Sequence, residues 1–325
     1  MEKSCIVSDK LSADAVIKQT RANGLLDRNY CIEQDENYVY IPLVRTVAGY
    51  ATHDFRPRMD ASAKIRQGLA RMGIKNRDLS YIRLGNSLIF KNKISTKIAR
   101  VYAGEMIIDN IYVETGKILG VKRKPTLKLL YGKGYETRIR ESGITYTLDL
   151  HKVMFSPGNI NTRSKMRYMD FTGLVVLDMF CGIGYFSLQV LKNSRPTNMI
   201  MCDINPDSIY YLKKNLIINR IQNPVTVFTG DSRVVLPLVR ADYIIMGNFN
   251  SVHFLVPSLI RSQHGTRISM HYLATTGGLD KAVYDIIHMA RKLGYILTCT
   301  GSERVKSVGP NYLHINSIFT VIRIL

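Results

Sequence analysis

Residues 175–193, VVLDMFCGIGYFSLQVLKN, contain an apolar run, an acidic residue and two glycines separated by one residue. The run from Val175 to Phe180 predicts a buried strand, residues 181–184 a turn, and residues 185–193 the helix that follows. Glycines at such a turn let the backbone approach a ligand at the carboxyl ends of the strands, where open α/β sheets bind small molecules. Any tight strand-to-helix turn also needs glycine, so a structural interpretation stays open.

Two later strands favour the binding interpretation. NMIMCDI and VTVFTG each lead into an acidic residue, Asp203 and Asp231, as the first strand leads into Asp178. Carboxylates are seldom buried without a partner. A carboxylate after the second strand can accept from both ribose hydroxyls of an adenosine, and one after the third strand can accept from the adenine amino group.

The absence of phosphate-binding motifs narrows the choice of cofactor. The chain has neither a Walker phosphate loop nor a GxGxxG motif, which predicts an adenosine cofactor without phosphates, and S-adenosylmethionine fits best. The predicted fold class is α/β, a Rossmann-like class I S-adenosylmethionine-dependent transferase sheet. Its seven strands should close with GYILTCTGSERV and HINSIFTVIRI, because strands alternate with helices after His151.

Composition excludes several classes of protein. The chain has 325 residues, 46% of them hydrophobic, so it can bury a core and should form two or three domains. No apolar run approaches the roughly 18–20 residues of a membrane span, and the first residues lack a signal-peptide pattern. The five cysteines show no CxxC spacing and predict reduced thiols in a cytoplasmic protein, with no metal site.

Positive charge is concentrated in one segment. Residues 61–140 carry 18 Lys or Arg and 5 Asp or Glu, a surplus of 13 out of a total formal charge of +20. Such a segment attracts a polyanion, usually a nucleic acid. A basic surface without a partner remains an alternative, whereas a membrane surface fits less well because the charges lie among strand-like stretches.

The changing pattern of apolar and polar runs along the sequence predicts four segments. Residues 1–55 should form a small N-terminal α/β domain, and residues 56–75 a linker. Residues 76–150, with short alternating runs, should form a basic β-rich RNA-binding domain. Residues 151–325 should form the cofactor-binding catalytic domain.

Several stretches resemble one family of tRNA enzymes over nearly the whole chain. They are GLLDRNYCIEQDENYVYIPL, GVKRKPTLKLLYGKG, KVMFSPGNINTRSKMRYMDFTGLVVLDMFCGIGYFSL, CDINPDSIYYLKKNLIINR and GDSR. The family unites the tRNA guanine N1-methyltransferases acting beside the anticodon with the aminocarboxypropyltransferases of wybutosine synthesis.

The segment after the fourth strand separates the two groups, and Thr162 departs from both. The methyltransferases follow the fourth strand with Asn-Leu-Pro, whereas this chain has Gly247, Asn248 and Phe249. The Ser-x-His-Phe run at residues 251–254 resembles the aminocarboxypropyl group. Thr162 stands where the methyltransferases carry a glutamate proposed to remove the guanine N1 proton, and the usual transferase pattern also keeps that glutamate. A hydroxyl is far too weak a base for that role near neutral pH.

The resemblance implies roles for individual residues. Ser156 and Arg163 would hold the amino-acid portion of the cofactor, Asp203 the ribose, and Asp231 and Ser232 the adenine. The other predicted cofactor-binding residues are Asp178, Gly182, Gly184 and Gly247. Arg123 would reach the reacting base as a catalytic residue, and Lys122, Arg123 and Lys124 would bind RNA. His271 is expected to be a core or rim histidine.

These observations predict a cytoplasmic, monomeric tRNA-modifying enzyme that needs neither membrane nor metal. It would transfer the 3-amino-3-carboxypropyl group of S-adenosylmethionine to 4-demethylwyosine beside the anticodon of phenylalanine tRNA. One alternative is a tRNA guanine N1-methyltransferase acting on the same nucleotide. Another is a catalytically silent tRNA-binding protein.

Overall fold

The computed structural model describes residues 2–57, 61–74, 79–134 and 136–325. The chain divides into two compact units: residues 1–78 together with 96–107, and residues 79–95 together with 108–325. The boundary expected between residues 75 and 76 lies outside the described residues.

The first unit contains an antiparallel sheet and three helices. The strands are β1 (Glu2–Asp9), β2 (Glu33–Gln34), β3 (Tyr38–Pro42) and β4 (Ala51–Asp54), in the order β2-β3-β1-β4. The helices are α1 (Ala13–Ala22), α2 (Ala61–Arg71) and α3 (Thr96–Glu105). α1 packs onto the sheet through a small core that includes Ala13, Val39 and Ile41. The N-terminal segment is therefore α/β, as the sequence predicts, although β1 was not expected.

The second unit begins with β-rich structure. A four-stranded sheet has the order β5-β6-β7-β8, and a separate hairpin pairs β9 with β10. The strands are β5 (Tyr81–Leu84), β6 (Ser87–Phe90), β7 (Asn110–Glu114), β8 (Leu127–Tyr131), β9 (Glu136–Glu141) and β10 (Ile144–Asp149). The connection from β7 to β8 carries a tight turn, closed by the bridge between Leu119 and Lys124. We call residues 119–124 the basic turn.

The rest of the second unit is built on a seven-stranded sheet of order β13-β12-β11-β14-β15-β17-β16. The strands are β11 (Val175–Asp178), β12 (Asn198–Asp203), β13 (Val225–Thr229), β14 (Ala241–Met246), β15 (Ser262–Thr275), β16 (Tyr295–Ser307) and β17 (Tyr312–Ile324). The first five are parallel, and β17 runs antiparallel to both neighbours. The predicted Rossmann-like sheet is confirmed; its first strand ends at Asp178, two residues earlier than expected.

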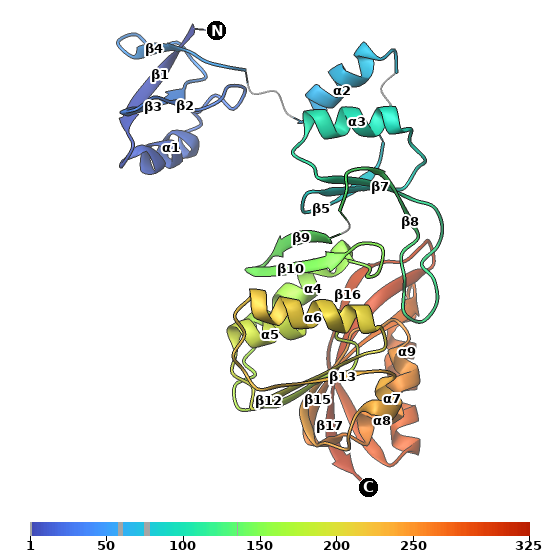
Figure 1. The fold of residues 1–325 in the computed structure, drawn as a ribbon. Helices are drawn as coiled ribbons and strands as arrows, with labels where there is room; N and C mark the ends of the chain where they lie inside the picture. Colours follow the sequence, from blue (N-terminus) through green and yellow to red (C-terminus); the bar gives the residue numbers. More distant parts are fainter. Residues whose placement is uncertain (1, 58–60, 75–78, 135) are drawn as a thin grey trace. The chain divides into compact units, whose positions relative to one another are not determined.

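Helices cover both faces of this sheet (Figure 1). They are α4 (Ile160–Lys165), α5 (Ser187–Asn193), α6 (Pro206–Ile218), α7 (Ser232–Val235), α8 (Leu255–Leu259) and α9 (Leu279–Lys292), with short 3₁₀ turns at Pro157–Asn159, Met166–Tyr168 and Ser251–Phe254. Alternate residues of β11 serve the two faces: Val176 packs with α5 and α6, and Leu177 with α8 and α9. Because helices bury both faces of the sheet, the parallel strands are almost continuously apolar.

The β9–β10 hairpin fixes the position of α6. Tyr146 and Leu148 share a core with Leu188 of α5 and Tyr211 of α6. The Asn215 amide oxygen accepts from the backbone N–H of Thr147 at 2.7 Å. The hairpin is therefore part of the second unit's core, which matters because it supplies Glu141 to the site described below.

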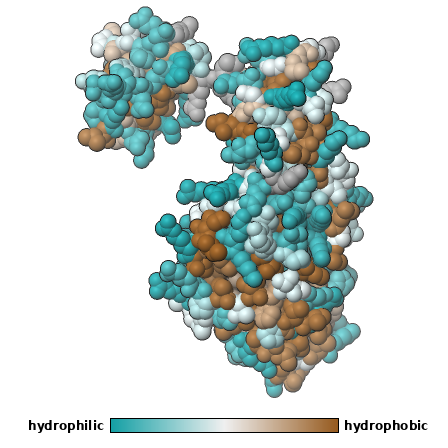
Figure 2. All heavy atoms as spheres, viewed as in Figure 1, coloured by the Kyte–Doolittle hydropathy of each residue, from teal (hydrophilic) through white to brown (hydrophobic). Residues whose placement is uncertain are grey.

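The surface is not uniform. On the face drawn in Figure 2, hydrophobic colour gathers at the lower end, which is the C-terminal end of the second unit. Exposed apolar residues in or next to α8 and at the C-terminus include Val256, Ile260 and Leu325. No helix in the described ranges is long and apolar enough to span a membrane.

Candidate active site

The glycine loop after β11 forms the floor of a cavity. Gly182 and Gly184 have φ of 56° and 96°, in the left-handed region that favours glycine. A Cβ on Gly182 would lie 2.5 Å from the ring of Tyr185, and one on Gly184 would lie 2.7 Å from Leu188. The two glycines are thus required both by backbone conformation and by packing, which answers the question left open by the sequence: the turn is structural, and it also borders the cavity.

Asp203 lies at the end of β12 beside this loop. Its Oδ2 accepts from the N–H of Gly182 at 2.9 Å and its Oδ1 from the N–H of Asn205 at 2.8 Å. Burial raises the pKa of Asp203, while the two N–H donors lower it. An ionised carboxylate has about four acceptor sites, so two remain for a diol. Asp203 lines the cavity, as a ribose-binding residue must.

The residues predicted to bind adenine lie in an adjoining cavity. Asp231 and Ser232 line it together with Phe180, which both cavities share. The Asp231 carboxylate caps α7 and pairs with Arg233 at 2.6 Å, and the hydrogen bond from that side chain lowers the pKa of Asp231. The buried Ser232 hydroxyl has no hydrogen-bond partner within the described residues. A hydroxyl without a partner in this cavity is available to hydrogen-bond with a bound ligand.

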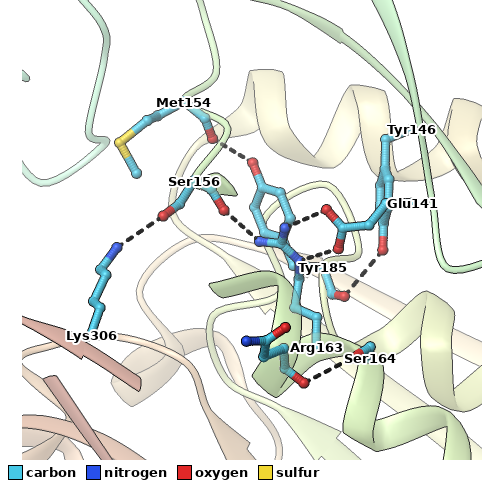
Figure 3. Close-up of polar contacts among 9 residues, drawn as sticks. Glu141, Tyr146, Met154, Ser156, Arg163, Ser164, Tyr185 and Lys306 are labelled. Carbon is cyan, nitrogen blue, oxygen red and sulfur yellow. Dashed lines mark hydrogen bonds and ion pairs between the residues drawn. The ribbon is translucent and has the colours of Figure 1, made fainter. Parts of the chain in front are cut away.

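Arg163 is held by a buried ion pair that the sequence did not reveal (Figure 3). Its Nε and Nη2 donate to the two carboxylate oxygens of Glu141 at 2.8 Å and 2.6 Å, and Nη1 donates to the Ser156 carbonyl at 2.7 Å. The side chains of Arg163 and Glu141 are 1% and 5% exposed. Arg163 borders the first cavity, but its fork already binds a carboxylate of the protein itself. Its predicted contact with the cofactor stays a prediction.

Lys306 is the functional candidate that sequence reasoning missed. It lies on β16, and its Nζ donates to the Ser156 hydroxyl at 3.2 Å (Figure 3). Burial, together with the nearby charges of Arg123 and Arg163, lowers the pKa of Lys306. Lys306 borders a third cavity, which shares Ser156, Arg123 and Phe249 with the first.

The basic turn brings Arg123 to the point where the three cavities meet. Arg123 has φ of 52°, unusual for a side-chain-bearing residue, and its guanidinium lies 5.3 Å from the centre of the Phe249 ring. Its buried Nε has no partner among the described residues, and burial lowers the pKa of Arg123. Lys122 and Lys124 are exposed, and Lys122 borders the first cavity.

The segment after β14 also lines the first cavity. Gly247, Asn248 and Phe249 all border the first cavity, and a Cβ on Gly247 would lie 2.7 Å from the ring of Phe186. Behind Phe249 lies a buried histidine pair, in which His271 Nδ1 is 2.8 Å from His314 Nε2. Burial lowers the pKa of His271 to about 3 and that of His314 to about 4, so both are neutral.

Two predicted residues lie away from the cavities. Asp178 is fully buried, accepting from the Ser187 hydroxyl at 2.6 Å and from the N–H of Phe180 at 3.2 Å. Burial raises the pKa of Asp178 to about 7. Gly184 packs below the loop. Neither borders any of the three cavities described here, so both support the loop, and direct contact with a cofactor stays a prediction.

Thr162 lies in α4 and is buried. It does not border any of the three cavities formed by the described residues. The next residue, Arg163, is paired with Glu141. In the described part of the chain, no group of three or more His, Cys, Asp or Glu side chains could hold a metal ion.

Comparison with known proteins identifies the family. The model of the TRM5/TYW2 methyltransferase domain matches residues 137–297, and that of the tRNA methyltransferase 5 N-terminal domain matches residues 8–51. A tRNA(Phe) (4-demethylwyosine(37)-C(7)) aminocarboxypropyltransferase from Methanocaldococcus jannaschii is 31% identical over 249 residues, which span 75% of this chain and 96% of that enzyme. The chain belongs to the TRM5/TYW2 family.

Both branches of the TRM5/TYW2 family resemble this chain. The tRNA (guanine(37)-N(1))-methyltransferase Trm5b of Pyrococcus abyssi is 28% identical over 314 residues, 92% of this chain and 93% of the relative. The crystal structure of M. jannaschii TYW2 in complex with AdoMet has a TM-score of 0.60 and 26% identity, covering 75% of this chain and all of that one. Family membership thus confirms the resemblance seen in the sequence.

Proposed function

We propose that this protein transfers the 3-amino-3-carboxypropyl group of S-adenosylmethionine to C7 of 4-demethylwyosine at position 37 of phenylalanine tRNA, a step in making wyosine derivatives. The observation that carries the proposal is the similarity to the M. jannaschii enzyme of that activity over 96% of its length. The first two cavities support it, because Asp203 and the glycine loop in the first and the unsatisfied Ser232 hydroxyl in the second suit an adenosine.

The chemistry needs positioning more than acid or base strength. The bound sulfonium supplies an electrophilic carbon: the ring carbon forms a bond to it, the bond to sulfur breaks with its electron pair, and the ring carbon's proton passes to solvent. The pocket decides which of the three sulfonium carbons faces the base. Arg123 lies at the junction of the cavities, and in this proposal it orients the base and stabilises negative charge on it.

The N1-methyltransferase remains the second candidate, favoured by the match to P. abyssi Trm5b over 92% of this chain, including the N-terminal model at residues 8–51. Thr162 argues against it, because no carboxylate stands at that position to take the N1 proton. Asn248 and Phe249 in place of Leu-Pro argue against it too.

The nucleoside by-product separates the candidates. We expect methylthioadenosine when the protein is incubated with S-adenosylmethionine and tRNA bearing 4-demethylwyosine, and none with tRNA bearing unmodified guanine at position 37. Chromatography with mass detection measures both by-products. S-adenosylhomocysteine formed on the guanine tRNA would establish the methyltransferase, and the absence of any by-product would establish a silent binding protein.

Salt dependence tests the role of the basic turn. Replacing Lys122 and Lys124 with alanine should weaken tRNA binding and flatten the plot of log affinity against log salt by about one to two units, because each phosphate contact contributes roughly 0.7–0.9 units. Filter binding at several salt concentrations measures the slope. Replacing Lys281 and Lys292, two exposed lysines of α9, provides the matched control. An unchanged slope in the Lys122/Lys124 variant would place the RNA elsewhere.

The same proposal implies a cytoplasmic monomer. Its five cysteines are all free in the structure, as a reducing compartment requires. The predicted boundaries at residues 55, 75 and 150 form part of this proposal, with residues 1–55 recognising the tRNA body and the basic segment binding near the anticodon.

A further inference from the structure

Positive charge gathers where the first and third cavities share Ser156, Arg123 and Phe249. Arg163 is balanced by Glu141, but Lys306 and Arg123 form no ion pair with any carboxylate in the described ranges. Lys306 and its neighbours Arg123 and Arg163 repel one another, since both arginines lower the pKa of Lys306. Uncompensated cations that are partly buried call for an anionic ligand.

The Lys306 ammonium has donors left over for a ligand beside Ser156. Its contact with the Ser156 hydroxyl uses one polar partner and leaves two of its three N–H donors free. Lys306 approaches across Gly158, where an added Cβ would lie 3.0 Å from its Cδ and 3.1 Å from its Nζ. Gly158 has no positive φ, so the space, and not the backbone conformation, is what glycine provides here.

We propose that Lys306, with the Ser156 hydroxyl, binds the carboxylate of the amino-acid tail of S-adenosylmethionine, and thereby turns the aminocarboxypropyl arm toward the RNA base. Arg163 then acts as a positioning residue: three of its five N–H donors are already bound to Glu141 and to the Ser156 carbonyl. Lys306 borders the third cavity, which residues of β5–β8 also line, next to Arg123 and Phe249. A carboxylate bound to Lys306 would hold the aminocarboxypropyl arm extended away from the adenosine part of S-adenosylmethionine. This inference rests on the proposed function.

Binding of cofactor fragments to the apo-protein tests it without turnover. Lys306→Met should weaken S-adenosylmethionine binding by about tenfold to a hundredfold, the effect of losing one charge-assisted hydrogen bond. Methylthioadenosine, which has no tail, and decarboxylated S-adenosylmethionine, which keeps the amine but not the carboxylate, should bind the variant and the parent protein equally. Titration calorimetry measures all three ligands, and Lys281→Met is the matched control on an exposed face.

A second variant guards against a folding artefact. Gly158→Ala keeps every charge but displaces the Lys306 side chain, so it should also weaken S-adenosylmethionine binding and spare methylthioadenosine. Lys306→Arg should recover part of the affinity. Equal losses for all three ligands in Lys306→Met, or no loss for any, would overturn the assignment. If the parent protein bound neither S-adenosylmethionine nor methylthioadenosine, the proposed function itself would fail.

Discussion

Asp203→Ala will abolish measurable S-adenosylmethionine binding while leaving tRNA binding nearly intact. The change removes two expected hydrogen bonds to the ribose, worth on the order of 3 kcal/mol or more when both are charge-assisted. It also removes the acceptor that fixes the N–H of Gly182, so the glycine loop loses its anchor. Titration calorimetry with the cofactor and filter binding with tRNA measure the two affinities on one preparation.

Asp285→Ala is the matched control for this change. Asp285 lies on α9, where its exposed carboxylate pairs only with Lys281 among the described residues. It should leave both affinities unchanged. Unaltered cofactor affinity in Asp203→Ala would remove Asp203 from the site and would require a different place for the ribose.

Glu141→Gln will lower the free energy of unfolding by about 3–5 kcal/mol, because it leaves the Arg163 charge buried without its partner. The pair joins β9 to α4, so the loss should also loosen the wall that carries Ser156. Denaturant unfolding followed by circular dichroism measures the free energy, and cofactor titration under native conditions measures the effect on the pocket.

The double variant Glu141→Leu/Arg163→Met shows whether the loss of stability comes from the unpaired Arg163 charge or from any substitution in this part of the core. Replacing both charges with apolar side chains of similar size should restore much of the stability. Lys281→Ala, which breaks an exposed pair, should change the free energy of unfolding by less than about 1 kcal/mol. If Glu141→Gln were as mild as that control, the ion pair would contribute little to the fold.

The sheet could be predicted because its signals are local. Each parallel strand is a short apolar run followed by a helix, and the glycines that follow β11 sit beside the strand they terminate. Asp178 and Asp203 end β11 and β12, and strands that pair in parallel bring their carboxyl ends together. Asp178 was harder to interpret: being acidic at a strand end does not say whether the side chain faces a ligand or Ser187.

The contacts that complete the site could not be predicted, because they join distant segments. Lys306 and Ser156 are 150 positions apart, and the register of β16 against β17 shifts three times on the way. The sequence around Glu141 contains one local sign that this carboxylate is buried. In ETRIRE the buried positions alternate, and Glu141 falls on the same face as Thr137 and Ile139. A carboxylate on the buried face of a strand needs a cationic partner, but the sequence alone does not say which cation.

Asn205 joins the basic turn to Asp203, so we expect the proposed RNA and cofactor sites to be interdependent. Its amide donates to the carbonyls of Lys122 and Lys152 at 3.3 Å and 3.2 Å, while its backbone N–H donates to Asp203. A tRNA that fixes the basic turn should therefore raise the affinity for S-adenosylmethionine. Reciprocity then requires the cofactor to raise the affinity for tRNA by the same factor. Once the arm has moved to the RNA, the remaining nucleoside lacks the carboxylate, so we expect cooperativity to fall and both products to dissociate more readily.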